Sequence, residues 1–144
     1  MNLDFDTNDP RLWTYRARVT RVVDGDTIDV VIDRGFGDYL RTRVRLLGVD
    51  TPELRPRRKP LEERQREREA AIKAKDWVEE KIGGKEIILR TYKAGKYGRW
   101  LAVIWLPLPD NAIDKLGDVI AHRAGKSIND RLLEEGLARP YPSK

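Results

Sequence analysis

The stretch Val44-Arg45-Leu46-Leu47-Gly48-Val49-Asp50-Thr51-Pro52-Glu53 joins a strand-like half to a half that carries two carboxylates. Its first half belongs to an alternating run over residues 39–47, with apolar residues and a threonine on one face and arginines on the other. Such alternation is typical of a β-strand with one buried face. In the second half, Pro52 biases the backbone of Thr51 toward an extended shape and so fixes the direction of Glu53. The stretch therefore predicts a strand followed closely by two carboxylates.

Two further strand patterns precede this one. Residues 15–23 alternate, with a β-bulge expected near Thr20, and residues 27–32 are rich in β-branched side chains. The Asp-Gly-Asp sequence at residues 24–26 is a turn signal between them, and residues 34–38 mark a second turn. We therefore expect the first three strands to form an antiparallel meander.

The rest of the chain mixes helical and strand patterns. The expected elements are a helix over 61–82, strands over 85–91 and 99–106, and a second helix from 127 to 135. The first helix is predicted from helical spacing of Ala71, Ala74, Val78 and Ile82, and the second from a sequence typical of a capping box. Five short strands and two helices fit a five-stranded Greek-key barrel, together with several other small α+β folds.

Composition limits the class of protein. The chain has 144 residues, the size of one domain with one core. It has no cysteine, which excludes disulfides and thiolate metal sites. No apolar run approaches the roughly 20 residues of a membrane span, and the acidic start lacks the order of a signal peptide. We therefore expect no membrane partner and favour a cytoplasmic location. The net charge of +5 favours partners that are polyanions.

Three segments together resemble one known family. They are Asp24-Gly25-Asp26-Thr27, Val44 to Glu53, and Lys96-Tyr97-Gly98-Arg99, and they resemble the staphylococcal nuclease (thermonuclease) family. The resemblance runs from about Tyr15 to about Arg139. It implies a mainly β member of the α+β class, namely a five-stranded OB-fold Greek-key barrel with two helices, and the family's third helix is missing here. We expect a single nuclease-like domain over residues 1–144, with a flexible lead-in at 1–13 and an insert at 107–126.

The resemblance also implies a metal site. It assigns Asp26 and Asp50 as carboxylate ligands of calcium, and the backbone carbonyl of Thr51 as a further ligand. Hard cations prefer such oxygen ligands, and the sequence leaves magnesium and manganese open. Asp24, by contrast, is interpreted as an ordinary turn residue.

The remaining roles follow from the same resemblance. Arg45 and Arg99 are expected to hold the scissile phosphate, since an arginine fork grips two oxygens. Glu53 is expected to act on the attacking water, either by taking its proton or by orienting it. Lys96 and Tyr97 match positions that contact the neighbouring phosphate of the bound strand.

Three departures from the family accompany these matches. Gly95 stands where the family usually has an acidic residue, which predicts a more mobile loop. Of the family's pair of tyrosines that stack on nucleotide, only Tyr141 remains, out of register, which predicts weaker substrate binding. Helical spacing in the insert at 107–126 suggests a short amphipathic piece covering barrel surface, with a dimer contact as the alternative cover.

The basic residues 55–59 fit either a track for a nucleic-acid backbone or a solvated loop.

These observations favour an enzyme. The expected function is a calcium-dependent nuclease that hydrolyses DNA and RNA with low sequence specificity, prefers single strands, and is a monomer or weak dimer. The alternative is a catalytically degenerate OB-fold module that only binds nucleic acid. A binding module has no physical need for three carboxylates, which oppose the approach of a polyanion, so the enzyme is the better interpretation.

Overall fold

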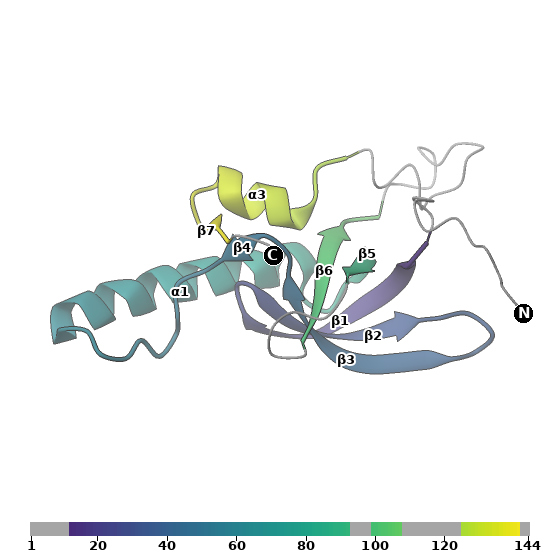
Figure 1. Cartoon of the computed structure of the whole chain (residues 1–144), viewed down its shortest axis with the longest axis horizontal. Helices are drawn as coiled ribbons and strands as arrows, with labels where there is room; N and C mark the ends of the chain where they lie inside the picture. Colours follow the sequence, from purple (N-terminus) through teal and green to yellow (C-terminus); the bar gives the residue numbers. More distant parts are fainter. Residues whose placement is uncertain (1–11, 93–98, 108–124, 142–144) are drawn as a thin grey trace, which may run out of the picture.

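Five strands close into a barrel in the order β1-β2-β3-β6-β5 (Figure 1). The computed structural model describes residues 12–92, 99–107 and 125–141. The barrel strands are β1 (Thr14–Asp24), β2 (Thr27–Asp33), β3 (Tyr39–Leu46), β5 (Glu86–Tyr92) and β6 (Trp100–Trp105). Strands β3 and β6 pair in parallel and every other neighbouring pair is antiparallel. This is the Greek-key arrangement of an OB fold, so the predicted fold is confirmed.

Strand β1 is long enough to pair with two neighbours. Its ladder with β2 slips between Val19 and Arg21, which leaves Thr20 as the predicted bulge. Its first half pairs with β5, from Thr14 to Arg18. A bulge bends and twists a strand, and that bend lets β1 help to close the barrel. Alternate residues of the strands point inward and form a core of branched aliphatic side chains, among them Val19, Ile28, Val30, Val44, Leu89 and Ile104.

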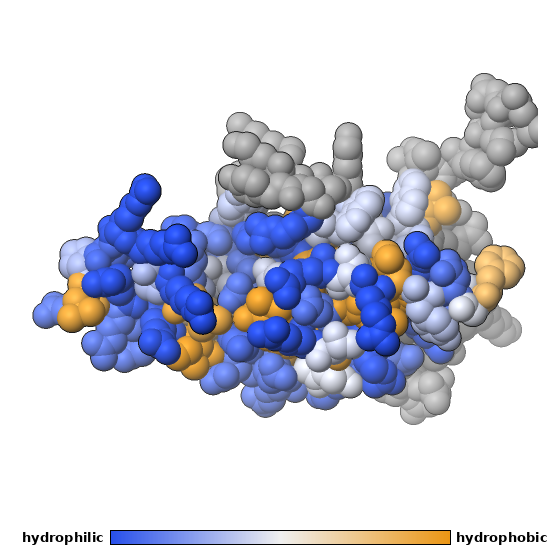
Figure 2. Space-filling view, turned by 90° about the horizontal axis from the view of Figure 1, so that it is seen from below, coloured by the Kyte–Doolittle hydropathy of each residue, from blue (hydrophilic) through white to orange (hydrophobic). Residues whose placement is uncertain are grey.

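Helix α1 (Leu61–Ile82) covers part of the barrel with one apolar side. Its buried residues are Ala71, Ala74, Val78 and Ile82, as the helical spacing predicts. All four lie from Ala71 onward, and the part of the helix before Ala71 projects beyond the barrel (Figure 1). The surface seen in Figure 2 is mostly hydrophilic with small apolar patches, and this end of the molecule is among its bluest parts.

Helix α3 (Ile128–Glu134) is anchored by its first turn. The hydroxyl oxygen of Ser127 accepts a hydrogen bond from the backbone nitrogen of Asp130 at 3.0 Å, as the capping sequence predicts. The buried Asn129 side chain accepts from the backbone nitrogen of Ile104 at 3.1 Å and donates to the backbone oxygen of Leu47 at 2.9 Å. These bonds fix α3 against β6 and against the end of β3, where the carboxylate-bearing segment begins.

A small two-stranded sheet lies outside the barrel and was not predicted. Strand β4 (Val49–Asp50) pairs with β7 (Arg139–Pro140), and the backbone nitrogen of Tyr141 donates to Gly48 at 3.0 Å. The C-terminal segment is thereby fixed beside the residues that follow β3.

Among the described residues, no helix is both long enough and apolar enough to cross a membrane. Most of the predicted lead-in and insert lies outside the described residues.

Candidate active site

The Asp-Gly-Asp turn between β1 and β2 fixes one carboxylate firmly. Asp26 is 5% exposed, and its backbone oxygen accepts from Leu46 at 2.8 Å. One of its carboxylate oxygens accepts from the hydroxyl of Thr27 at 2.9 Å, and the other accepts from the backbone nitrogen of Thr51 at 3.2 Å. Asp26 therefore ties the turn to the end of β3 and to the segment after β4.

Close packing explains the glycine in this turn. A Cβ atom on Gly25 would lie 2.8 Å from Cγ2 of Thr51 and 3.0 Å from Cβ of Ala74 on helix α1. Real Cβ atoms do not approach other carbons so closely, so a larger residue would push the turn away. Gly25 thus lets three parts of the chain meet at the site.

Arg45 stands between the two carboxylates that the sequence singles out. Its Nη1 lies 3.3 Å from Asp26 Oδ2, and its Nη2 lies 3.5 Å from Asp50 Oδ1. Nη2 also donates to the backbone oxygen of Val49 at 3.2 Å. The Arg45 side chain is only 17% exposed, and a partly buried charge needs a partner. The carboxylates of Asp26 and Asp50 are the partners of this guanidinium.

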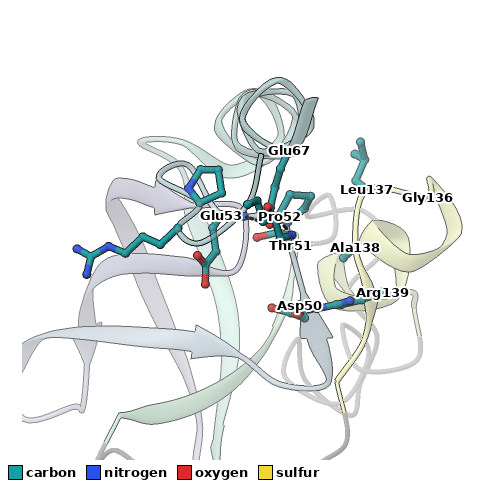
Figure 3. Close-up of a pocket in the computed structure, with 12 residues that line it drawn as sticks. Asp50, Thr51, Pro52, Glu53, Glu67, Gly136, Leu137, Ala138 and Arg139 are labelled. Carbon is teal, nitrogen blue, oxygen red and sulfur yellow. Dashed lines mark hydrogen bonds and ion pairs between the residues drawn. The ribbon is translucent and has the colours of Figure 1, made fainter. Parts of the chain in front are cut away.

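Two residues of the C-terminal segment complete this cluster. Sequence reasoning gave Arg139 no role and considered Tyr141 only as the remaining member of a nucleotide-stacking pair. Arg139 Nε lies 3.0 Å from Asp50 Oδ2, so Asp50 has a guanidinium on each oxygen; Figure 3 shows Arg139 reaching across to Asp50. Cζ of Arg45 lies 4.9 Å from the ring centre of Tyr141, a cation–π contact. Only the pairing of β7 with β4 brings these residues in, and nothing local in the sequence signals it.

One open cavity of about 570 Å³ gathers most of the predicted site residues. Its lining includes six of them, namely Asp26, Arg45, Asp50, Thr51, Glu53 and Arg99. We call it the site cavity. Arg99 and Glu53 are exposed, so both are accessible to a ligand there. The other two predicted residues, Lys96 and Tyr97, lie outside the described residues.

Further charged residues line the site cavity, among them Arg21, Asp24, Arg55 and Lys75. The pKa of Asp24 is raised, first because burial disfavours its charged form and then because Asp26 is close. Asp24 is therefore part of the cavity wall as well as a turn residue. Lys75, one of the nearby cations that partly offset this rise, comes from helix α1.

Glu67 holds the loop that follows the site segment. Its Oε1 accepts from the backbone nitrogen of Glu53 at 3.4 Å, and its Oε2 lies 2.7 Å from Nζ of Lys59. The hydrogen bond from Lys59 is the main reason why the pKa of Glu67 is lowered. These residues line a second cavity of about 550 Å³, drawn in Figure 3, on the side of Glu53 that faces Arg139. Sequence reasoning missed Glu67, because it is one of several glutamates in a charged helix.

The oxygen donors of the site cavity fit a hard cation. Asp26, Asp50 and Thr51 lie together there, and the hydroxyl of Thr51 is buried with no hydrogen-bond partner among the described residues. Within that part of the chain, no group of three or more histidine, cysteine, aspartate or glutamate side chains is arranged to hold a metal. A cation bound here would therefore need backbone, water or ligand oxygens to complete its shell, as hard cations at phosphate sites do.

Comparison with known proteins identifies the family. A sequence profile described as Staphylococcal nuclease homologue matches residues 43–144. The chain belongs to the staphylococcal nuclease family. The expected resemblance is thus confirmed. Of the six predicted residues that line the site cavity, the matched region includes five, namely Arg45, Asp50, Thr51, Glu53 and Arg99. Asp26 precedes the matched region, so its assignment to the site rests on its bonds and on the shared cavity.

Several relatives resemble most of this chain. An uncharacterized protein of Methanocaldococcus jannaschii is 33% identical over 143 residues, which cover 90% of this chain and 60% of that protein. A thermonuclease of Staphylococcus hyicus is 33% identical over 129 residues, covering 88% of this chain and 58% of that protein. A micrococcal nuclease of Shigella flexneri is 34% identical over 136 residues, covering 92% and 62%. The chain therefore spans about three fifths of the length of these three relatives.

Proposed function

We propose that this chain is a calcium-dependent nuclease that hydrolyses phosphodiester bonds of DNA and RNA with low sequence specificity. The observation that carries the proposal is the meeting of Arg45 and Arg99 with Asp26, Asp50 and Glu53 around one open cavity. Arginine guanidinium groups beside carboxylates suit the hydrolysis of a phosphodiester. The reaction needs positive charge to neutralise the phosphoryl oxygens, and it needs a group that orients the attacking water. Relatives named thermonuclease and micrococcal nuclease support the same reaction class.

The two arginines would hold the phosphate. Arg45 is held in place by Asp26, Asp50 and the ring of Tyr141, so its fork is already oriented at the cavity wall. Arg99 is exposed and free to move toward a bound phosphate. Because charge grows on the phosphoryl oxygens in the transition state, each donor stabilises that state more than the ground state. Removal of one such donor typically costs about 2.7–4 kcal/mol.

Glu53 would direct the attacking water. Its side chain is exposed at the cavity, while its backbone nitrogen is held by Glu67, so the carboxylate can turn within a fixed loop. Proton abstraction and simple orientation of the water both fit this position. By resemblance, Lys96 and Tyr97 would contact the next phosphate along the strand.

Asp26, Asp50 and Thr51 would hold the calcium ion, with magnesium or manganese as weaker candidates. When bound, the ion supplies positive charge that polarises the phosphoryl group. The residues themselves do the positioning: Asp26 is fixed by its bonds to Thr27 and Thr51, and Asp50 is fixed by the pairing of β4 with β7. An OB barrel offers a surface for the backbone of a single strand, so we infer single-stranded DNA and RNA as partners of a monomer or weak dimer.

The deciding experiment is cleavage of single-stranded DNA by the purified chain in calcium and in chelator. Glu53→Ala and Arg99→Ala are expected to lower the rate by about 100-fold or more. Arg34→Ala is the control, because Arg34 pairs with Asp38 in the β2–β3 turn and does not line the site cavity. If the parent chain binds DNA but cuts nothing in calcium, magnesium or manganese, the proposal is wrong and a binding-only module is correct.

A further inference from the structure

A groove opens directly beside the site cavity. It has a volume of about 590 Å³ and lies between residues 54–56 and the first half of helix α1. Leu54 and Arg55 line both the groove and the site cavity, so the two spaces meet at these residues. A ligand bound at the site cavity could therefore continue into the groove without crossing the body of the protein.

The helical wall of the groove contains one stripe of side chains beside Gln65 and Glu69. Leu61, Arg64, Arg68 and Ile72 all line the groove and follow one another at intervals of three or four residues. Lys75 continues this stripe and lines the site cavity. From Arg64 to Lys75 the helix rises by about 16 Å. Each phosphate of one strand of B-DNA occupies about 3.4 Å of helix axis, so the stripe is long enough to contact more than one phosphate.

The groove carries free positive charge. Arg55, Arg64 and Arg68 form no ion pair with any residue in the described parts of the chain, and Glu69 is the one carboxylate in the lining. Unpaired arginines at an exposed surface attract phosphates without loss of an internal partner.

The second cavity, of about 550 Å³ and on the other side of Glu53, has fewer cations without an ion pair. There Lys59 is paired with Glu67 and Arg139 is paired with Asp50, which leaves Arg57 as the cation without an ion pair among the described residues. The available positive charge is therefore greater on the side of the groove. Charge complementarity favours that side as the path of a polyanion.

Apart from Gln65, the uncharged residues that line the groove are apolar, and none of the lining residues is aromatic. Leu61 is 71% exposed and Ile72 is 40% exposed, so both offer surface to a ligand. At the end of the molecule formed by α1, Figure 2 shows strongly hydrophilic side chains around small apolar patches. Without an aromatic residue in its lining, the groove has no platform for base stacking, which suits contact with the sugar-phosphate backbone.

We propose that this groove binds the sugar-phosphate backbone of the nucleic-acid strand outside the catalytic cavity, with Arg55, Arg64 and Arg68 as its phosphate contacts. The inference rests on the proposed function and adds to it a second binding region. It explains why the part of α1 before Ala71 has an arginine stripe although it contains none of the buried residues of the helix. It also means that affinity depends on strand length, because a dinucleotide fills only the site cavity.

The test compares two double variants of equal charge. Arg64→Gln/Arg68→Gln removes two groove contacts, and Arg66→Gln/Lys73→Gln removes two exposed cations from the opposite side of the same helix. Binding of a labelled single strand of about 16 nucleotides, a length at the upper end of single-domain sites, is measured by fluorescence anisotropy in chelator at several salt concentrations. Cleavage of a dinucleotide and of the long strand is measured in calcium.

For the groove variant we expect about tenfold weaker binding of the long strand, and a salt dependence of log K that is shallower by about 1.4, at roughly 0.7 per phosphate contact. Cleavage of the dinucleotide should be unchanged, and the control variant should keep parental binding of the long strand. Equal losses in both double variants, or no loss in the groove variant, would overturn the inference. Because binding is measured without cleavage, an inactive parent would disprove the nuclease while the groove is still tested; a parent that binds no strand would disprove both.

Discussion

Nε of Arg139 lies 3.0 Å from Oδ2 of Asp50, so the C-terminal strand β7 places a cation on a carboxylate proposed to bind calcium. Arg45 contacts the other oxygen of the same group. A metal ion bound by Asp50 would compete with Arg139 for this oxygen. The pair is largely exposed on the arginine side, so the competition is modest.

Arg139→Gln is therefore expected to tighten calcium binding. An exposed ion pair is worth about 0.2–1 kcal/mol, which corresponds to an increase in affinity of up to about fivefold. Isothermal titration of the chain with calcium measures it. Arg34→Gln removes the same charge from the β2–β3 turn and should leave the affinity unchanged. Weaker calcium binding by Arg139→Gln would mean that Arg139 orients Asp50 more than it competes with the ion.

The ring of Tyr141 is expected to orient Arg45 for the phosphate. Cζ of Arg45 lies 4.9 Å from the ring centre, and such contacts at exposed sites contribute about 0.5–1 kcal/mol. Tyr141→Ala should therefore lower kcat by about two- to fivefold. Tyr141→Phe keeps the ring and should keep the rate. A loss of equal size in both variants would assign the effect to the hydroxyl, against this prediction.

Local patterns predicted the strands and helices of the barrel because each has its own periodicity, whereas the choice of the OB-fold barrel among several small folds came from the family resemblance. The spacing of Ala71, Ala74, Val78 and Ile82 gave the buried side of α1, and the β-branched run after Asp26 gave β2. The periodic elements depend on neighbours in the sequence, so the sequence displays them. Asp26, Arg45 and Glu53, by contrast, were assigned to one site by the family resemblance, and all three line one cavity.

Features that depend on distant pairs were not predictable in this way. Asn129 is bonded to Leu47 across 82 residues, and Arg139 is bonded to Asp50 across 89 residues. Neither partner carries a local sign of the other, since an asparagine in a first helical turn and an arginine near a glycine have many ordinary roles. The strand pair β4–β7 was missed for the same reason, because each strand has only two residues.

The ion pair of Glu67 with Lys59 should make part of the stability depend on pH. Because the pKa of Glu67 is lowered from its ordinary value of 4.5, the folded state favours its charged form. The stabilisation is thus complete above that ordinary value and is lost as the pH falls through the lowered pKa. Denaturant unfolding between about pH 3 and pH 7 should show this loss in the parent chain.

Glu67→Gln should remove that part of the acid dependence and lower the stability at neutral pH. Its matched control is Glu80→Gln, which removes a charge from an exposed position of the same helix with no ion pair among the described residues. Since Glu67 also accepts from the backbone nitrogen of Glu53, Glu67→Ala, which removes this acceptor, should slow cleavage more than Glu80→Ala does. Identical acid profiles for Glu67→Gln and the parent would contradict the assignment.

The final prediction concerns the close approach at Gly25. In Gly25→Ala the new Cβ meets Cγ2 of Thr51 at 2.8 Å and Cβ of Ala74 at 3.0 Å, so the turn must move away from the site segment and from α1. Overpacking of this kind typically costs about 1–3 kcal/mol of unfolding free energy, measured by urea denaturation. Cleavage should fall further than stability explains, because the bond from Thr51 to Asp26 spans the same gap.

A second substitution separates this clash from other causes. Thr51→Ser keeps the hydroxyl and removes Cγ2, the atom closest to the new Cβ. In the Gly25→Ala background it should therefore recover part of the lost stability, whereas alone it should be neutral or mildly destabilising. The contact with Ala74 remains, so recovery should be incomplete. Strictly additive effects in this double-mutant cycle would show that the two positions do not interact, contrary to the packing described here.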